Sequence, residues 1–225
     1  MKAYFSILVI LITTLSVGLA QNNNFQEKSD PNAKLILDKL EKQFKSYTSY
    51  ELPFTIEFEN PENGKTQDKG QYIQKGKSYF IKLGSQEIYT DGKTNWVYLK
   101  DRNEVQITDV EPNTNNNFFS PQQLLESYKS NQFYYAITKE STIKGKKICE
   151  IEFKPLARGV SYTKIRLTID KTQNKLISLR VFNRDGSKQT LQLGNVVSNK
   201  IYDASVFHFD PKTVPGIRIE DLRID

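Results

Sequence analysis

The hydrophobic pattern of the chain changes its period close to residue 49. Before that point, between Asp30 and Tyr47, apolar residues recur at helical spacing and charged residues occupy the other positions. Asp30 followed by Pro31 has the form of an N-cap with proline at the first helical position. The pattern therefore predicts an amphipathic helix of about four turns, with one face that must pack on other apolar groups.

From Tyr50 onward, apolar and polar residues alternate, as in strands of a sheet with one dry and one wet face. Pro53, inside the first run at 50–59, indicates an edge or a bulge because proline cannot donate to a ladder. Further strands are predicted near 69–75, 78–83, 87–90, 95–99, 103–107, 133–139, 147–154, 162–169, 175–182, 188–197 and 206–209, with a last edge strand in the tail 214–223.

A β-meander lies at the centre of this predicted sheet. Asp91-Gly92 separates two β-prone runs, which is a strong hairpin signal and predicts a type I′ turn. The only tryptophan, Trp96, stands in the second run, and the turn 183–186 predicts another hairpin further along. The meander therefore carries much of the aromatic content of the sheet.

One segment interrupts the strands, between residues 108 and 132. A polar loop at 111–117 is followed by Ser120-Pro121, which begins a short helix that we expect to reach about residue 129. Leu124, Leu125 and Tyr128 share one side of that helix. Two interpretations stay open: the segment is a lid over the apolar face of the sheet, or it is an ordinary packed crossover.

These elements predict a mainly β fold built on one antiparallel sheet, in a single domain that spans residues 30–225. A sheet with one continuous apolar face must curl around something or be covered. Two short amphipathic helices cannot cover all of it, so an apolar concavity should remain. Such a concavity is typical of a site for an apolar ligand or partner.

The N-terminus has the form of a secretory signal peptide over residues 1–20. A basic start at Lys2, an apolar stretch from Phe5 to Val17 and the small residues Gly18 and Ala20 match its three regions. Residues 21–29 are rich in Asn and Gln and should form a flexible leader. We expect an exported, periplasmic protein that is not itself lipid-anchored, since no cysteine follows the cleavage site.

Removal of the signal peptide takes one of the 32 basic residues and none of the 26 acidic ones, so the net charge falls from +6 to 31 − 26 = +5. Lys144, Lys146 and Lys147 form the densest basic cluster. It is either a solvated strand edge or a patch that meets anionic lipid headgroups or an acidic partner. An exported protein without a binding motif is not expected to bind nucleic acid.

Motifs for catalysis or for a metal or cofactor are not found. Cys149 shares the parity of Ile151 and Phe153, so we expect a small buried hydrophobic residue and not a nucleophile. The only histidine, His208, should be a surface strand residue, and one histidine cannot build a zinc site. The glycine-rich run 70–78 has one residue too many for a phosphate loop and lies between two strands. An enzyme is therefore not predicted.

Several motifs together resemble one family. They are Asp30-Pro-Asn-Ala-Lys, Gly70-Gln-Tyr-Ile-Gln-Lys, Thr90-Asp-Gly-Lys-Thr-Asn-Trp-Val-Tyr, Asn103-Glu-Val and Phe207-His-Phe-Asp-Pro. The chain is similar in these segments to the periplasmic outer-membrane lipoprotein carrier, the LolA family. The ending Val214-Pro-Gly with Asp-Leu-Arg223 resembles versions from Bacteroidetes-like organisms.

This resemblance implies an unclosed β-barrel with a few helices as a lid over an apolar cavity, which holds the acyl chains of triacylated lipoproteins. It implies a monomeric chaperone that is loaded by an inner-membrane lipoprotein-releasing ABC transporter and unloads to an outer-membrane acceptor. In the best-known branch an arginine before the third strand bonds to the lid, and here Gly76 stands at that position between Lys75 and Lys77. The resemblance therefore leaves open whether the closed state is latched.

The candidate residues of the cavity combine hydrophobic parity with this resemblance. The expected lining residues are Phe54, Ile56, Phe58, Tyr72, Phe80, Trp96 and Tyr98, and the expected lid residues are Leu124 and Leu125. A periplasmic sensor or general carrier of lipids on the same fold is the alternative function. A lipid hydrolase would need a nucleophile and a base in the cavity, and the acceptor lipoprotein would need a cysteine at the cleavage site.

Overall fold

The structure is a computed structural model that describes residues 28–110, 125 and 128–223. Its first element is the helix α1 (Pro31–Lys45). The strands are β1 (Ser49–Asn60), β2 (Gly64–Lys75), β3 (Ser78–Leu83), β4 (Gln86–Thr90), β5 (Thr94–Leu99), β6 (Glu104–Asp109), β7 (Phe133–Ile143), β8 (Lys146–Pro155), β9 (Tyr162–Asp170), β10 (Lys175–Asn183), β11 (Lys188–Leu193), β12 (Val197–Ser198) and β13 (Arg218–Asp221). Short 3₁₀ turns are η1 (Lys100–Arg102), η2 (Ala204–Phe207) and η3 (Pro211–Thr213).

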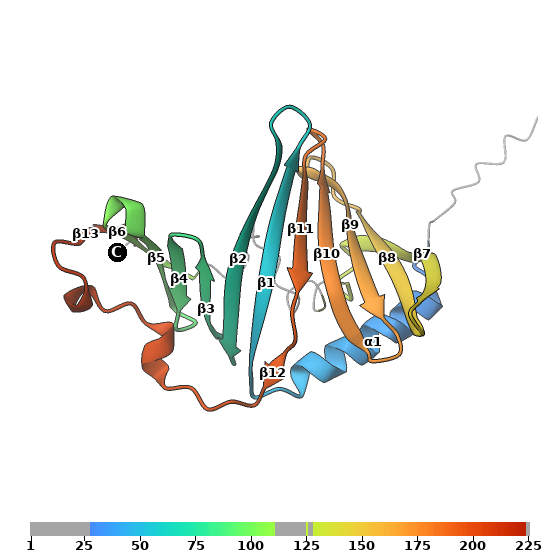
Figure 1. Ribbon diagram of the computed structural model, residues 1–225, viewed down its shortest axis with the longest axis horizontal. Coiled ribbons are helices and arrows are strands. Elements are labelled where there is room, and N and C mark those ends of the chain that lie inside the picture. Colours follow the sequence, from blue (N-terminus) through green and yellow to red (C-terminus); the bar gives the residue numbers. More distant parts are fainter. Residues whose placement is uncertain (1–27, 111–124, 126–127, 224–225) are drawn as a thin grey trace, which may run out of the picture.

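All of these strands belong to one sheet, in the order β13-β6-β5-β4-β3-β2-β1-β11-β10-β9-β8-β7, with β12 paired to β1. The sheet is strongly curved, but its edge strands β13 and β7 do not meet (Figure 1). The predicted fold class, a mainly β unclosed barrel, is therefore confirmed. β1 lies between two meanders, β2–β6 and β7–β11, and joins them through antiparallel pairing with β2 and β11.

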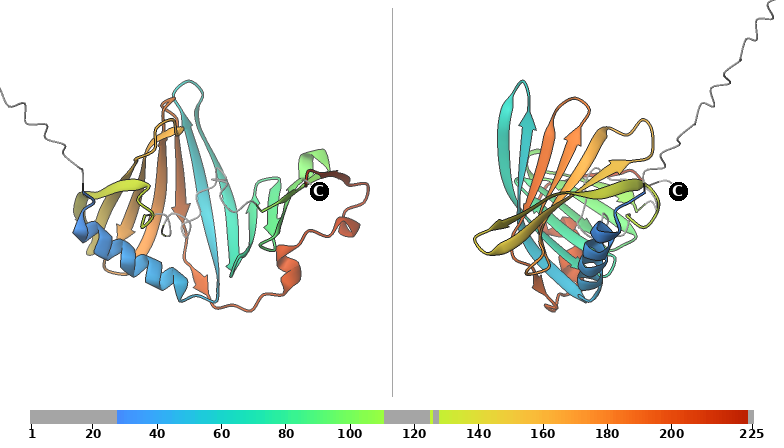
Figure 2. Two further views of the ribbon diagram at one scale, coloured as in Figure 1. Left: turned by 180° about the vertical axis from the view of Figure 1, so that it is seen from behind. Right: turned by 90° about the vertical axis from the view of Figure 1, so that its right-hand side faces the viewer.

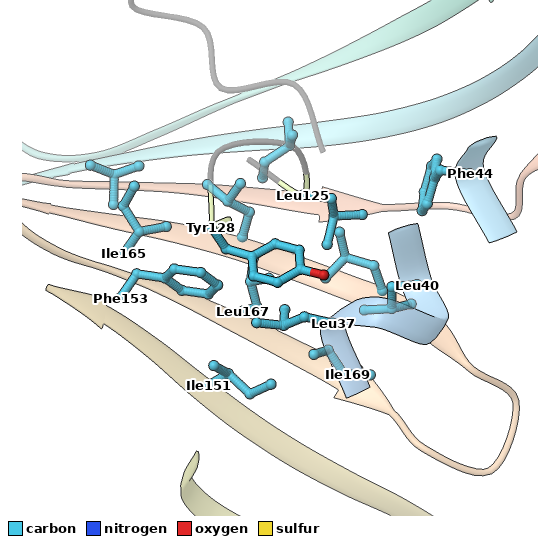
Figure 3. Close-up of a cluster of buried hydrophobic side chains, with 14 of the residues drawn as sticks. Leu37, Leu40, Phe44, Leu125, Tyr128, Ile151, Phe153, Ile165, Leu167 and Ile169 are labelled. Atoms are coloured by element: carbon cyan, nitrogen blue, oxygen red, sulfur yellow. The ribbon is translucent and has the colours of Figure 1, made fainter. Parts of the chain in front are cut away.

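α1 crosses the inner side of the half of the sheet formed by β7–β11 (Figure 2). Asp30 caps it as predicted, because its carboxylate accepts from the N–H of Asn32 at 2.8 Å. Ala33, Leu37 and Leu40 are fully buried, and they share one core with residues of β8 and β9 (Figure 3). The apolar stripe of the helix and the dry face of the sheet thus cover each other.

The turn between β4 and β5 differs from the prediction. The hairpin itself is confirmed, but only Gly92 has a positive φ, so the turn is not type I′. The carboxylate of Asp91 accepts from the N–H groups of Lys93 and Thr94 at 2.8 and 2.9 Å. Such a side chain can replace the backbone bond of a two-residue turn, which explains the longer connection.

The C-terminal segment also departs from the prediction. The strand expected over 188–197 ends at Leu193, and a strand at 206–209 does not form. Asp203 and Asp210 each accept a backbone N–H two residues ahead and start the 3₁₀ turns η2 and η3. These caps override the alternating pattern. Residues 199–217, here called the C-terminal strap, run along the outer side of the sheet to β13 (Figure 1).

The polar side of α1 holds the turn that leads into β7. The hydroxyl of Tyr128 donates to Asp38, and the ammonium of Lys129 pairs with Glu41, whose side chain is only 7% exposed. Lys45 adds a second ion pair to Glu41 at 2.8 Å. Burial alone would raise the pKa of Glu41, but the two ammonium groups bring that pKa below its usual range.

Replacing Glu41 by Gln should lower the free energy of unfolding at pH 7 by about 1–3 kcal/mol, because two ammonium groups lose their buried partner. A lowered pKa means that the stabilisation is complete above the unfolded-state value and is lost as pH falls through the folded-state value. The difference from the parent should therefore shrink between pH 5 and pH 3 in urea titrations. The exposed Glu62→Gln is the control, and a difference that is constant with pH would contradict this assignment.

Gly70 and Phe54 are directly opposite in the β1–β2 ladder, and the phenyl ring covers the glycine. A Cβ at Gly70 would lie 2.2 Å from Phe54 Cζ and 2.7 Å from the carbonyl oxygen of Lys82. Gly70→Ala should therefore cost about 1–3 kcal/mol of stability. Part of this cost should be recovered in the double variant with Phe54→Leu, measured by urea unfolding. Additive effects of the two substitutions would show that the ring contact is not the cause.

Candidate functional site

The two faces of the sheet can be followed strand by strand through its register. Residues directly opposite in a ladder lie on the same side of the sheet. One row consists of Leu52, Tyr72, Ile81, Ile88 and Val97. Tyr50 lies two residues before Leu52 on β1 and therefore on the same face. Its ring contacts that of Phe44 of α1, with centroids 5.4 Å apart. This row therefore marks the inner face, the face that α1 partly covers.

A second apolar row lies on the outer face of β2–β6. It consists of Ile73, Phe80, Tyr89, Trp96 and Ile107. The C-terminal strap packs over it. Phe209 lies 5.7 Å from Tyr89 and 5.0 Å from Tyr98 between ring centroids. In this part of the molecule the sheet is therefore apolar on both faces.

The seven residues expected to line one cavity fall on these two faces. Phe54, Ile56, Phe58 and Tyr72 lie on the inner face, and Phe80, Trp96 and Tyr98 lie on the outer face. The expectation of a single lining set is corrected accordingly. The reason is that β3 and β5 carry apolar residues at both parities, since one parity packs under the strap. Hydrophobic alternation cannot choose between faces in such strands.

The four inner residues differ in exposure. Phe54, Ile56 and Tyr72 are buried, whereas Phe58, near the end of β1, is 36% exposed. Tyr72 stacks on Tyr79 of β3 with centroids 6.0 Å apart. The buried members belong to the main core and contribute to stability as well as to the shape of the inner face.

Sequence reasoning missed the part of the inner face beyond the buried core. Tyr79, Leu83, Ile88, Val97 and Leu99 are apolar, half-buried and on this face, and we call them the inner apolar patch. Burial raises the pKa of the Tyr79 hydroxyl, which stays neutral. The available signal was the pairing set by the Asp91-Gly92 hairpin, which places Ile88 opposite Val97.

One polar atom on the same face is distinctive. The carboxamide oxygen of Asn95 is buried and has no hydrogen-bond partner within the described residues. Asn95 shares the parity of Val97 on β5, so it lies at the edge of the inner apolar patch. An unpaired buried acceptor can receive a hydrogen bond from a polar group of a bound molecule.

The two expected lid residues have different outcomes. Leu124 lies outside the described residues, together with most of the helix predicted there. Leu125 is 1% exposed and packs into the inner core beside Tyr128 and residues of α1 (Figure 3). A side chain from the segment between β6 and β7 thus reaches the inner face, as both the lid and the crossover interpretation require.

Gly76 occupies the turn between β2 and β3 with φ of +58°, a conformation that favours glycine. No side chain can extend from this position toward the inner face. The ammonium of the neighbouring Lys75 instead donates to the carbonyl oxygen of Tyr202 at 2.8 Å. Lys75 therefore holds the C-terminal strap.

A groove of about 820 Å³ is lined by residues of both the strap and the outer face of the sheet. Its apolar lining includes Phe80, Tyr89, Tyr98, Val206, Phe209 and Val214. Glu87 lies within it and accepts from the ammonium of Lys100 at 2.7 Å and the hydroxyl of Tyr89 at 2.8 Å. Burial would raise the pKa of Glu87, but these donors lower it, so the carboxylate is compensated inside the chain.

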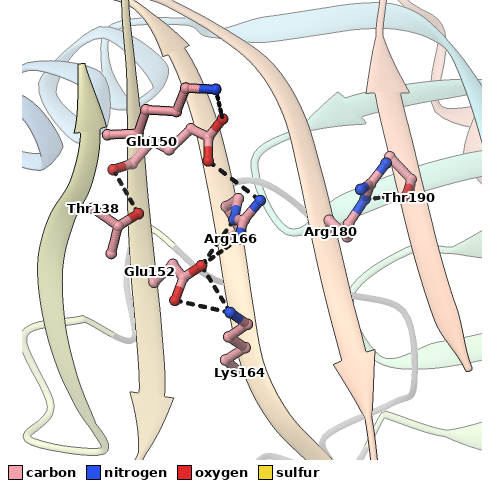
Figure 4. Close-up of polar contacts among 8 residues, drawn as sticks. Thr138, Glu150, Glu152, Lys164, Arg166, Arg180 and Thr190 are labelled. Carbon is pink, nitrogen blue, oxygen red and sulfur yellow. Dashed lines mark hydrogen bonds and ion pairs between the residues drawn. The ribbon is translucent and has the colours of Figure 1, made fainter. Parts of the chain in front are cut away.

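The outer face of β8–β11 is polar (Figure 4). Glu152 pairs with Lys164 at 2.9 Å and with Arg166, which also reaches Glu150 at 3.3 Å. Arg180, directly opposite Arg166 in the ladder, donates to the hydroxyl of Thr190 at 2.8 Å. This half of the sheet has one dry and one wet face, so its only large apolar surface faces α1.

The two residues that could act as a nucleophile or a base, Cys149 and His208, have packing roles in the structure. Cys149 is fully buried, as predicted, and burial raises the pKa of its thiol to about 11. His208 is exposed, as predicted, but it lies in the strap against Trp96, with ring centroids 4.4 Å apart. Within the described residues no group of three or more His, Cys, Asp or Glu side chains could hold a metal ion.

Comparison with solved structures relates this fold to other proteins. An uncharacterized conserved protein from Thermus thermophilus is 12% identical, with 84% of this chain and 99% of that chain covered and a TM-score of 0.54. Its likeness concerns the fold alone. A LolA superfamily protein from Nitrosomonas europaea is 12% identical over 79% of this chain and 97% of that chain, with a TM-score of 0.41.

A putative outer membrane lipoprotein-sorting protein domain from Vibrio parahaemolyticus is similar at 11% identity, over 78% of this chain and 97% of that chain, with a TM-score of 0.43. A search of the curated proteins finds no match. Among the described residues, no helix is long and apolar enough to span a bilayer. The model of the family described as outer membrane lipoprotein carrier protein LolA matches residues 72–210, which is more than half of the chain. The chain therefore belongs to the LolA family.

Proposed function

We propose that this protein is a periplasmic carrier of acylated lipoproteins, which holds their acyl chains against the inner face of its sheet. The observation that supports this most is the inner apolar patch, a half-buried apolar surface that continues the core of an unclosed sheet. Membership of a family of lipoprotein carriers supports the same cargo. Of the expected lining residues, Phe54 and Tyr72 adjoin this patch through the β1–β2–β3 ladders. Ile56 and Phe58 continue the same face further along β1.

The physical demand on such a carrier is severe. Each buried CH₂ contributes about 0.8 kcal/mol, so three long acyl chains avoid roughly 30–40 kcal/mol of contact with water. This exceeds the free energy of the tightest non-covalent complexes, about 18–21 kcal/mol. The chains must therefore pass directly from one apolar environment to another of similar free energy. An open, adaptable apolar face suits this exchange better than a closed pocket.

The route of the cargo follows from the same demand. A donor in the inner membrane, the lipoprotein-releasing ABC transporter, would supply the energy for extraction, and an outer-membrane acceptor would take the chains. The signal peptide predicted over residues 1–20 would bring the carrier to the periplasm, where it works as a monomer. Leu125 would be part of the cover over the bound chains, since it is buried in the inner core.

In the empty carrier, part of the inner face would already be covered by the protein itself. α1 covers the inner side of β7–β11, where Ile151, Leu167 and Ile169 are fully buried. The inner apolar patch on β3–β5 is half-buried. Cargo would then bind first at this patch, beside the free acceptor of Asn95.

The test uses inner-membrane vesicles that hold a triacylated lipoprotein. Addition of the purified protein should move the lipoprotein into the soluble fraction as a one-to-one complex. Val97→Glu should reduce release at least tenfold, because a charge on the inner apolar patch opposes burial of acyl chains. Tyr98→Glu is the matched control, since the next residue of the same strand points to the outer face, and it should retain release.

Both variants are first compared with the parent by circular dichroism and thermal unfolding, because Tyr98 packs on Phe209. Equal loss of release in two folded variants would remove the argument for the inner face. Absence of release by the parent, together with copurified phospholipid, would instead favour a general lipid carrier or sensor with the same fold.

A further inference from the structure

Three segments that are distant in the sequence meet at one end of the sheet. They are the β7–β8 turn, the β9–β10 turn and the C-terminal half of α1. The N–H of Lys171 donates to the carbonyl of Lys147 at 2.7 Å, and the N–H of Lys147 donates to the hydroxyl of Thr172 at 2.9 Å. On the other side, the amide of Asn174 donates to the side chain of Gln43 at 2.8 Å. The β9–β10 turn therefore holds the other two segments in place.

This end is strongly basic. We define the basic end as six lysines in and beside these segments, Lys39, Lys42, Lys144, Lys146, Lys147 and Lys171. Lys45 is left out because it pairs with the buried Glu41. Two of them have carboxylate partners: Lys146 lies 3.7 Å from Asp170, whose side chain is nearly inaccessible, and Lys171 pairs with Glu140 at 2.5 Å. Lys39, Lys42, Lys144 and Lys147 form no ion pair with any described residue. These six lysines and their two carboxylate partners together carry a net charge of 6 − 2 = +4.

Two exposed apolar side chains accompany these lysines. Ile143 is 55% exposed and directly precedes Lys144 at the β7–β8 turn. Leu35 is 61% exposed, and its spacing from Lys39 and Lys42 places the three on one side of α1. Apolar groups exposed beside unpaired lysines are typical of surfaces that rest on a lipid headgroup layer.

The β7–β8 turn is also short and closed by strand pairing. Lys144 and Gly145 both have positive φ, 50° and 79°, as in a tight two-residue type I′ turn. Strand pairing continues to Ile143 and Lys146, directly beside that turn. The backbone that carries Lys144, Lys146 and Lys147 therefore belongs to a tight turn and to the paired strand next to it.

We propose that the basic end docks this protein on the anionic phospholipid surface of a bilayer. Charge complementarity supports this partner, since lysines near an anionic membrane each contribute about a fivefold gain in binding. Four unpaired lysines give a weak, reversible and salt-sensitive association. Docking would turn the end of the sheet that carries α1 and the β7–β8 turn toward the membrane. The inference does not require the acyl cargo.

The experiment measures cosedimentation of the purified full chain with two kinds of vesicle. One contains phosphatidylglycerol mixed with phosphatidylcholine, and the other contains phosphatidylcholine alone. The protein should bind the anionic vesicles, and binding should be lost between about 50 and 500 mM salt because the Debye length shortens. The variant Lys144→Gln with Lys147→Gln should bind about 30-fold more weakly, at about fivefold for each lysine.

The matched control is Lys93→Gln with Lys212→Gln, which removes two exposed lysines from the β4–β5 turn and the strap and should leave binding unchanged. Ile143→Ser should weaken binding a few-fold without changing its salt dependence. Equal binding to both kinds of vesicle would overturn the proposal and point to contact through the cargo face. Equal losses in the two lysine variants would also overturn it, since only total charge would matter.

Discussion

Burial of the inner face of the sheet against α1 is the interaction on which the rest of this structure depends. Leu37 and Leu40 of the helix and Leu167 and Ile169 of β9 are completely buried in one core. At about 25 cal/mol per Å² of apolar surface, such contacts are the main favourable term of folding. The helix is long enough to cover β7–β11 but not β3–β5, so the inner apolar patch remains half-buried.

The C-terminal strap covers a second apolar surface, the outer face of β2–β6. Phe207 and Phe209 are buried there, and Lys75 and Glu51 bind the strap at Tyr202. The strap also delivers β13, which extends the sheet by parallel pairing with β6. With this face packed under the strap, the half-buried apolar residues of the inner face remain for a ligand. The wet outer face of β8–β11 needs no such cover, because its charges are paired with one another.

The polar contacts are placed where they preserve this division of faces. Asp38 and Glu41 lie beside the apolar stripe of α1 and bind Tyr128 and Lys129, so the chain enters β7 beside the helix. In the same part of α1, Asn174 donates to the side chain of Gln43 and connects the helix to the β9–β10 turn. Apolar burial and polar contacts thus fix the same orientation of the helix, which decides how much of the inner face it covers.

Local pattern was sufficient for the elements of the fold. Periodicity and capping are properties of neighbouring residues. They were sufficient to predict the helix at Asp30-Pro31, the strands of both meanders, the burial of Cys149 and the mainly β class. The motifs around Asp91-Gly92 and Trp96 were sufficient for the family. The same pattern misjudged residues 206–209, where the capping aspartates decide the local conformation.

Only the tertiary structure decided which residues share a face. Phe80, Trp96 and Tyr98 look equivalent to Tyr72 in the sequence, yet they lie under the strap on the other side of the sheet. When both faces of a strand are buried, both parities become apolar, and alternation no longer carries information about direction. The basic end was likewise visible in part as Lys144, Lys146 and Lys147, but its union with Lys171 and α1 depends on contacts between distant turns. The sequence by itself predicts which residues are apolar, charged or turn-forming. Which of them form one site depends on the register of the strands and on the segments that cover each face of the sheet.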